Sequence, residues 1–226
     1  ASPFFEFTRE FMNFEPEAWS LRWYRQMVGI SSIGDTTVVT DKWMMGTRNS
    51  FFVGIVATLL ATALGTVAAL GLSRPHMPFK AVLMAILISP MIVPLIITAA
   101  GMFFFYSKIG LTHTYLGLIL AHTALGTPFV VITVTATLTG FDTNLIRASQ
   151  SLGADTMRTF FKVIMPLILP GVISGGLFAF ITSFDEVVIV MFIGSVEQIT
   201  IPKQMWAGLR QETSPVILCM ATCLVA

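Results

Sequence analysis

Two adjacent carboxylates, Asp185 and Glu186, stand inside an otherwise apolar run in the last quarter of the sequence. Placing a carboxylate at membrane depth costs free energy unless the group is paired, hydrated or protonated. Such residues are therefore candidates for a functional role. They could line a pathway and favour a cationic solute, or relay an ion or a proton. They could equally have a structural role, such as capping a broken helix or pairing with a basic residue of another subunit.

No other group of side chains suggests catalysis or metal binding. The histidines His76, His113 and His122 are scattered, whereas a catalytic or metal site needs converging nucleophiles or ligands. The sequence has no GxxxxGK[ST] stretch, which excludes P-loop binding of ATP. With 13 basic and 12 acidic residues, the chain has no overall field that favours nucleic acid. We therefore expect no bound cofactor or metal, no enzymatic activity and no nucleic-acid partner.

The composition is that of a polytopic membrane protein. Hydrophobic residues make up 55% of the chain and charged residues 11%, against about 25% charged in a typical soluble domain. Apolar runs long enough to cross a bilayer predict spanning helices at 51–72, 81–106 and 115–138, and from Pro166 into the 190s. The run 216–226 is too short to span, so we expect a last helix that is cut short. The sequence thus predicts an all-α bundle in a membrane.

Small residues recur at intervals of four in the first and last of these segments. The two stripes consist of Ala57, Ala61, Gly65 and Ala69, and of Gly171, Gly175, Ala179 and Ser183. Lipid supplies no hydrophobic drive for helices to associate, so small residues that allow close approach mark contact faces. Both stripes are predicted to pack against other helices.

The second segment contains Pro90 and Pro94. Each proline lacks an amide donor and clashes with the carbonyl four residues earlier, which predicts a bent or broken helix near the bilayer centre. A break is tolerated where protein or a water-filled cavity satisfies the freed carbonyls. A role in lining the pathway and a purely structural kink are equally compatible with this pattern.

A polar interruption, at about 140–165, separates the last two apolar segments. Within it Leu145, Ala148 and Leu152 share one face of a short amphipathic helix, and Gly153 suits the left-handed cap position that ends it. From this pattern alone, the helix could pack on its own bundle or belong to a surface loop.

Basic residues indicate the orientation of the chain. The loops 73–80 and 139–165 carry five lysines and arginines, against three in the loops 107–114 and 193–213, so the first pair is placed in the cytoplasm. Residues 1–50 then form an outer segment, in which Trp19, Trp23 and Tyr24 suggest a short helix at the membrane surface or packed on the protein.

The interruption resembles the cytoplasmic loop of permease subunits of ATP-binding-cassette importers. That family pattern is Glu-Ala-Ala, three residues, Gly, nine residues, Ile, one residue, Leu-Pro. The chain matches its spacing with Arg147, Ala148, Ser149, Gly153, Val163, Met165 and Pro166. Arg147 stands in place of the family's glutamate and Ser149 in place of its second alanine.

The stretches "WSLRWY", "LGTVAALGLSR", "LISPMIVPLII" and "ITSFDEVVIVMF" are similar to the second permease of spermidine/putrescine-type transporters. The resemblance implies a type I importer fold in 51–226 and a multi-pass protein of the bacterial inner membrane. It implies ATPase coupling by Leu145, Arg147, Ala148, Ser149, Leu152, Gly153, Ala154 and Pro166.

The resemblance also implies the partners. These are two ATP-binding subunits, which hold ATP and magnesium, a homologous but different second permease, and an external solute-binding protein. The implied solute is a polyamine or a similar small cation. The alternative is a self-sufficient secondary transporter or channel that uses Asp185 and Glu186 as an ion relay.

Overall fold

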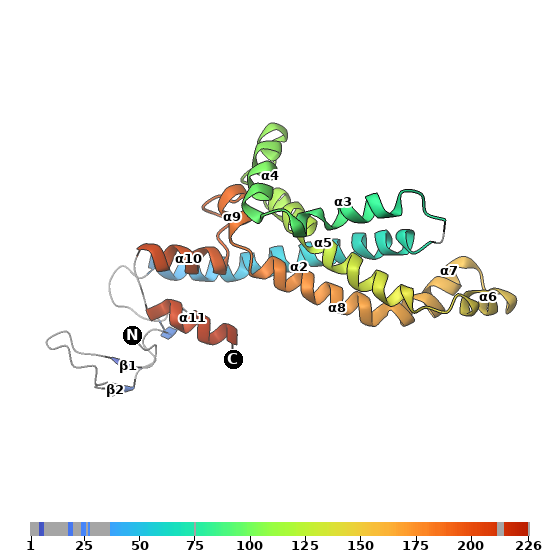
Figure 1. The fold of residues 1–226 in the computed structure, drawn as a ribbon. Coiled ribbons are helices and arrows are strands. Elements are labelled where there is room, and N and C mark those ends of the chain that lie inside the picture. The colour runs from blue at the N-terminus through green and yellow to red at the C-terminus, as the bar shows by residue number, and fades with distance from the viewer. Residues whose placement is uncertain are drawn as a thin grey trace.

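Three long helices lie side by side and form the core of the molecule (Figure 1). They are α2 (Thr37–Leu72), α5 (Tyr115–Thr139) and α8 (Met165–Phe184) in a computed structural model of the chain. The structure describes residues 5–6, 18–19, 24–25, 27, 37–74, 76–211 and 215–225. The predicted surface helix near Trp19 and Trp23 lies mostly outside these residues.

Shorter elements surround the three long helices. They are α3 (Lys80–Ile92), α4 (Leu95–Ile109), α6 (Asn144–Ser151), α7 (Thr156–Thr159), the π-helical turn η1 (Phe160–Ile164), α9 (Val188–Ile193), α10 (Ile201–Gln211) and α11 (Pro215–Val225). A short antiparallel pair, β1 (Phe5–Glu6) and β2 (Ala18–Trp19), precedes them and was not expected from the sequence. The predicted all-α fold class is confirmed for the body of the chain.

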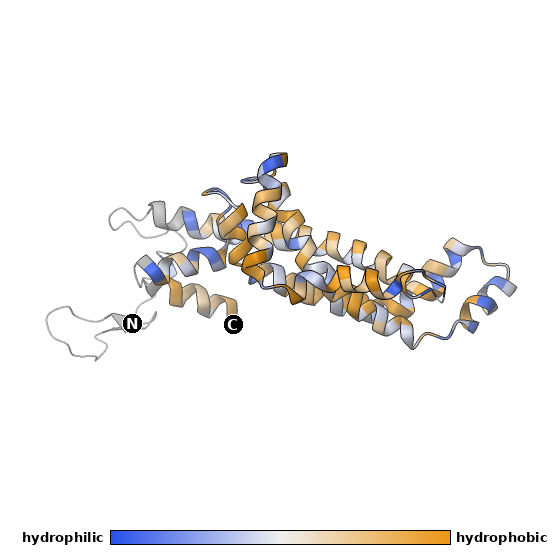
Figure 2. Ribbon diagram, turned by 45° about the horizontal axis from the view of Figure 1, so that its top comes forward, coloured by the Kyte–Doolittle hydropathy of each residue, from blue (hydrophilic) through white to orange (hydrophobic). Residues whose placement is uncertain are grey.

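Three helices are long and apolar enough to cross a membrane. They comprise Lys42–Leu72, Tyr115–Thr139 and Thr156–Phe184, while Lys80–Ile92 and Leu95–Ile109 would together make a fourth span but are bent by 104°. Apolar residues cover this bundle and polar residues gather toward its ends (Figure 2). The predicted polytopic arrangement is therefore present.

The helix boundaries correct two predictions. The first long helix begins at Thr37, well before Phe51. The prediction missed this start because it followed the apolar run, whereas the helix also includes the preceding turns, which contain polar residues. The last predicted span stops at Phe184 and does not continue into the 190s, because the chain leaves the helix at Asp185 and restarts as α9.

The loops divide between the two ends of the bundle, as the succession of spanning helices predicts. The segments 73–74, 76–79 and 140–164 lie together at one end, with α6 and α7 extending beyond the long helices (Figure 1). At the other end the His113 amide donates to the Ile193 carbonyl, and the Gln198 side chain donates to the His113 carbonyl. The two loops that were predicted to lie outside are thus joined by hydrogen bonds.

Candidate functional site

The helix α6 ends in a glycine cap. Gly153 has a φ of 83°, in the left-handed region that glycine adopts most easily. Its amide donates to the Gln150 carbonyl at 2.9 Å, and the Ala154 amide donates to the Ser149 carbonyl at 3.1 Å. These two bonds form a Schellman motif, which satisfies the last carbonyls of the helix and turns the chain sharply.

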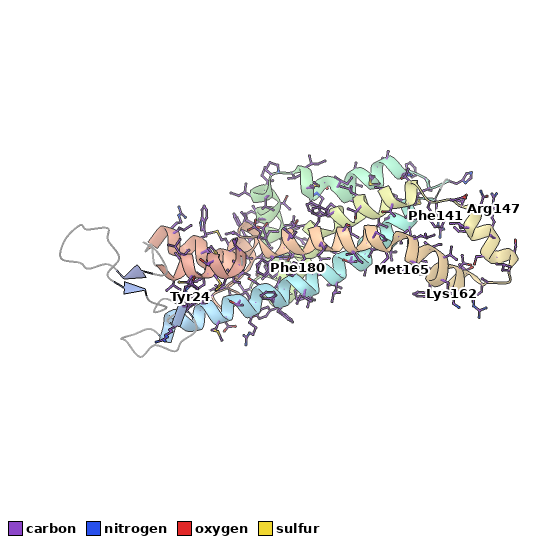
Figure 3. The ribbon with its side chains drawn as sticks, turned by 90° about the horizontal axis from the view of Figure 1, so that it is seen from below. Tyr24, Phe141, Arg147, Lys162, Met165 and Phe180 are labelled. Carbon is purple, nitrogen blue, oxygen red and sulfur yellow. The ribbon has the colours of Figure 1, made fainter. Side chains whose placement is uncertain are left out.

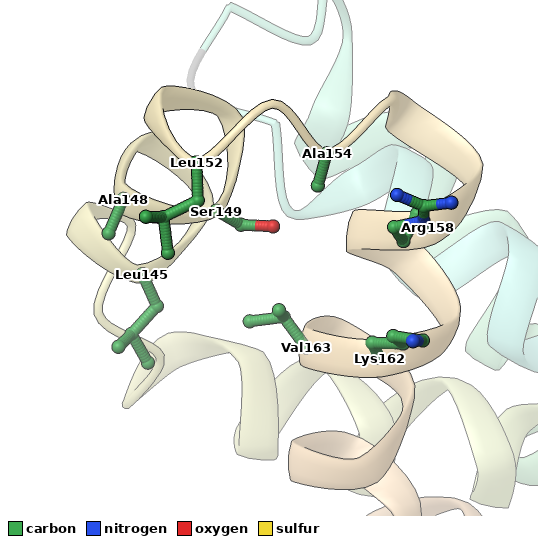
Figure 4. Close-up of a pocket in the computed structure, with 8 residues that line it drawn as sticks. All are labelled: Leu145, Ala148, Ser149, Leu152, Ala154, Arg158, Lys162 and Val163. Atoms are coloured by element: carbon green, nitrogen blue, oxygen red, sulfur yellow. The ribbon is translucent and has the colours of Figure 1, made fainter.

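A groove of about 440 Å3 lies between α6 and the helical segment formed by α7 and η1 (Figure 4). The residues of α6 and the following turn that line it are Leu145, Ala148, Ser149, Leu152 and Ala154. The opposite wall consists of Arg158, Lys162 and Val163. Five of the eight residues predicted to couple the chain to an ATPase therefore meet at one surface feature.

The other three predicted coupling residues lie elsewhere. Arg147 is exposed on α6 and does not line the groove, and it projects at the same end of the molecule as Lys162 (Figure 3). Gly153 shapes the turn without lining the groove. Pro166 is the second residue of α8, directly after η1, and does not line the groove.

One polar contact joins α6 to α7, and a second caps the start of α7. The Ser149 hydroxyl lies 3.0 Å from the hydroxyl of Thr159, a buried residue of α7. The Asp155 carboxylate accepts a hydrogen bond from the Arg158 amide and so caps the start of α7. The sequence pattern identified Ser149 only as a departure from the family's alanine, and the structure gives it a partner.

The three long helices meet at Val130, which is fully buried in α5. A Cβ atom on Gly65 of α2 would lie 2.6 Å from the Val130 Cβ, and one on Gly175 of α8 would lie 2.8 Å from the Val130 Cα. Both distances are too short for a side chain larger than glycine. Both small-residue stripes thus face α5 and meet it at Val130. No sequence pattern indicated this role for Val130.

The stripe on α8 contacts α5 along its length. A side chain on Gly171 would collide with Thr137, and Ala179 lies against Gly126. At the C-terminal end of the stripe the Ser183 hydroxyl lies 2.7 Å from Nδ1 of the buried His122. His122 therefore lies in the helix interface, bonded to Ser183.

The predicted break in the second apolar segment is present. Pro90 lies inside α3 and Pro94 precedes α4, and the two helices meet at 104°. Pro94 is exposed and Pro90 is half-buried in the chain. The residues at the break are therefore largely exposed in this chain.

The two adjacent carboxylates have different surroundings. Glu186 is buried, and its Oε1 accepts a hydrogen bond from the Ile189 amide at 2.9 Å, so it caps the first turn of α9. Asp185 terminates α8 and is exposed. The structural interpretation therefore fits Glu186, while Asp185 is the carboxylate that solvent or a solute can reach.

A polar network at the end of the bundle opposite α6 was not found from the sequence. The Asn49 amide donates to the carbonyls of Glu197 and Ile199, and the Tyr115 hydroxyl donates to Asn49 Oδ1. The adjacent Ser50 hydroxyl accepts from the Ile201 amide. The only sequence sign of this network was the polar Asn-Ser pair just before an apolar run.

Lys203 anchors the start of α10 to the end of α9. Its Nζ donates to the carbonyls of Val190 and Ser195 at 3.2 and 3.3 Å. Burial lowers the pKa of Lys203 from its ordinary value, because the protein around the amine replaces water.

The described residues contain no group of three or more histidine, cysteine, aspartate or glutamate side chains that could hold a metal ion.

Comparison with known proteins identifies the family. Residues 61–226 match the family model described as the inner membrane component of binding-protein-dependent transport systems. The chain is 27% identical to the spermidine/putrescine transport system permease protein PotC of Haemophilus influenzae, over 92% of this chain and 77% of that protein. It is 28% identical to the putrescine transport system permease protein PotI of Escherichia coli, over 92% and 73% of the two chains. The chain therefore belongs to the family of inner membrane components of binding-protein-dependent transport systems, as a multi-pass permease of the type I ABC importer fold.

Proposed function

We propose that this chain is a permease subunit of an ATP-driven importer, which forms part of the solute pathway and couples to separate ATP-binding subunits through α6. Residues 1–50 face the outer side, and 51–226 form the transmembrane permease domain. The helix α2 runs through this boundary without a break, since it covers Thr37–Leu72.

The surface of α6 is the observation that carries the coupling role. The helix extends beyond the bundle, and Leu152 at its end is 89% exposed while Leu145 is 43% exposed. Exposed apolar residues displayed on a capped helix outside the hydrocarbon core mark a surface that another protein covers. The partner is a soluble ATPase, because the permease has no P-loop of its own.

The solute is a polyamine or a similar small organic cation. This assignment rests on the names of the relatives PotC and PotI, which are permeases of spermidine/putrescine and putrescine systems. The exposed Asp185 supports it, since a carboxylate at the mouth of a pathway attracts cations. The broken segment at Pro90 and Pro94 is the second contribution to the pathway, where freed carbonyls can meet a solute.

The complete transporter has two ATP-binding subunits, a second permease that is homologous but different, and an external solute-binding protein. ATP and magnesium bind the ATP-binding subunits and not this chain. Closure of those subunits displaces α6, and the packed unit of α2, α5 and α8 carries the displacement toward the outer end.

Uptake into proteoliposomes that contain the purified complex tests this function. Labelled spermidine should accumulate when ATP is enclosed with the ATP-binding subunits, and accumulation should stop when ATP is omitted while the ion gradient is kept. A secondary transporter gives the opposite result, with uptake that follows the gradient and ignores ATP. Uptake of labelled sulfate or another anion in place of spermidine would overturn the assignment of the solute.

A further inference from the structure

The groove beside α6 has two unlike walls. Leu145 and Leu152 form an apolar wall on one side, and Arg158 and Lys162 stand across from them on the other (Figure 4). The volume of about 440 Å3 lies within the range of about 300–1,000 Å3 typical of pockets for small ligands, so the groove has room for more than one side chain.

The cations at this end have no partner within the described part of the chain. The side chains of Arg147, Arg158 and Lys162 form no hydrogen bond or ion pair with residues 37–74, 76–211 or 215–225. The two carboxylates of the loop bond to backbone amides: Asp142 accepts from the Asn144 amide and Asp155 from the Arg158 amide, both at 2.9 Å. The basic wall therefore retains its full hydrogen-bonding capacity for an incoming acid.

The backbone that carries the basic wall is unusual. Lys162 and Val163 belong to the π-helical turn η1, which continues directly into α8. Such turns are rare and occur frequently at functional sites. The turn places a cation and an apolar residue side by side on the wall that faces α6.

We propose that this groove receives an acidic side chain of the ATP-binding subunit, held by Arg158 and Lys162, with an apolar neighbour of that acid against Leu145 and Leu152. The inference rests on the proposed function, which supplies the ATP-binding subunit, and it adds the charge that the partner presents. An acid that enters the groove leaves water and meets two cations one turn apart, so both its oxygens gain charge-assisted hydrogen bonds.

An anionic lipid headgroup has compatible charge but fits the groove less well. The helical segment Thr156–Phe184 has 29 residues, a length of about 43 Å, against about 30 Å of hydrocarbon. Its first turns therefore reach beyond the acyl chains. The apolar wall belongs to α6, which lies outside the bundle, so an acyl chain would have to leave the bilayer to cover it.

Carbodiimide coupling of the intact complex tests the proposal directly. This reagent joins a lysine amine to a carboxylate in contact with it, and mass spectrometry should find a peptide that links Lys162 to an aspartate or glutamate of the ATP-binding subunit. Lys162→Arg is the matched control, since it keeps the charge but cannot form the amide. That variant should bind the ATP-binding subunit normally and lose the crosslink.

Charge reversal measures the strength of the contact. The double variant Arg158→Glu with Lys162→Glu, held in lipid nanodiscs, should bind the ATP-binding subunit at least about tenfold more weakly than wild type. Binding by wild type should weaken as salt is raised, and this dependence should be reduced in the double variant. Lys80→Glu, an exposed cation at the same end of the bundle, should leave the affinity unchanged.

Three results would overturn the proposal. One is an assembled complex in which Lys162 forms no crosslink to the ATP-binding subunit. A second is unchanged affinity of the double variant together with lost binding of phosphatidylglycerol vesicles, which would assign the groove to lipid. The third is an ATP-binding subunit that does not associate with the wild-type chain at all, a result that rejects the proposed function itself and is distinct from the first two.

Discussion

Val130 is the residue on which the packing of the three long helices converges. It is fully buried, and glycines on two neighbouring helices approach it so closely that any Cβ atom there would collide with it. Helices in lipid associate through close van der Waals packing, which small residues permit. The geometry explains why Gly65 and Gly175 stand at the middle of their stripes.

Gly175→Leu should disrupt this contact. A leucine at this position would collide with Val130 and Thr133, and overpacking of this kind costs about 1–3 kcal/mol or forces the helices apart. We expect a lower thermal unfolding temperature for the purified complex and loss of subunits during size-exclusion chromatography. The control is Gly101→Leu on α4, where an added Cβ atom would have no neighbour within 4 Å. Equal stability of both variants would mean that the α8 stripe tolerates bulk.

The two adjacent carboxylates should differ in their response to loss of charge. Asp185→Asn removes an exposed charge and should raise the half-saturating concentration for spermidine by up to about fivefold, while the complex still assembles. Glu186→Gln keeps an oxygen that can accept from the Ile189 amide, so its affinity for spermidine should remain at the wild-type value.

Uptake measured over a range of spermidine concentrations separates the two carboxylates. Glu186→Ala, which removes the cap of α9, should instead lower the yield of folded complex. Wild-type affinity in the Asp185→Asn variant would show that this carboxylate does not contact the solute. A raised half-saturating concentration in Glu186→Gln would reject the capping role.

The stability of helix α6 depends on its C-terminal cap more than on its length. It has eight residues, and isolated helices shorter than about 12–15 residues are marginal in water. The Schellman motif at Gly153 and the hydrogen bond between Ser149 and Thr159 therefore decide its orientation. A partner that binds the surface of α6 requires both the Schellman motif and this hydrogen bond.

Gly153→Val should uncouple the chain from its ATP-binding subunits. A valine at a φ of 83° is strained by about 1–2 kcal/mol, although the space around the residue is open. The chain should insert normally but bind the ATP-binding subunit about tenfold more weakly, with reduced spermidine-stimulated ATP hydrolysis. Gly153→Asn is the control, because asparagine tolerates the left-handed region and should retain most of the activity. Normal stimulated hydrolysis in the valine variant would contradict the coupling role.

Sequence patterns predicted those elements that depend on local chemistry. The prolines predicted the break between α3 and α4, and the apolar periodicity with Gly153 predicted α6. Hydropathy misplaced the start of α2 and the end of α8, because it reports apolar length and not helical hydrogen bonding. The groove beside α6 could not be predicted, since its basic wall combines Arg158 of α7 with Lys162 of a π-helical turn that no local sequence pattern indicates.

The molecule as a whole has two polar ends joined by an apolar bundle (Figure 2). The end with α6 carries the exposed cations Arg147, Arg158 and Lys162. At the other end Asn49, Tyr115 and Gln198 join α2, α5 and the segment that leads into α10. In the proposed function the packed helices α2, α5 and α8 carry displacements between the two ends, so a change in the outer network should alter how solute stimulates ATP hydrolysis.

Asn49→Ala tests this coupling from the end remote from the ATP-binding subunits. The variant removes the Asn49 donor from the carbonyls of Ile199 and Glu197, although the Glu197 carbonyl also lies 3.2 Å from the Tyr115 hydroxyl, which can donate to it. A buried carbonyl left without a donor costs about 1–3 kcal/mol. The outer loops should then loosen. Affinity for the ATP-binding subunit should stay at the wild-type value, because α6 lies at the opposite end. Stimulation of ATP hydrolysis by spermidine and the solute-binding protein should nevertheless fall.

Tyr115→Phe is the graded control, since it removes the hydroxyl that donates to Asn49 but keeps the ring that packs against Phe52. Its effect on stimulated hydrolysis should lie between wild type and Asn49→Ala. Binding and hydrolysis should be measured on the same preparations, so that loss of assembly is distinguished from loss of coupling. If Asn49→Ala weakened binding of the ATP-binding subunit as much as hydrolysis, the outer network would support the overall fold and would have no separate part in coupling.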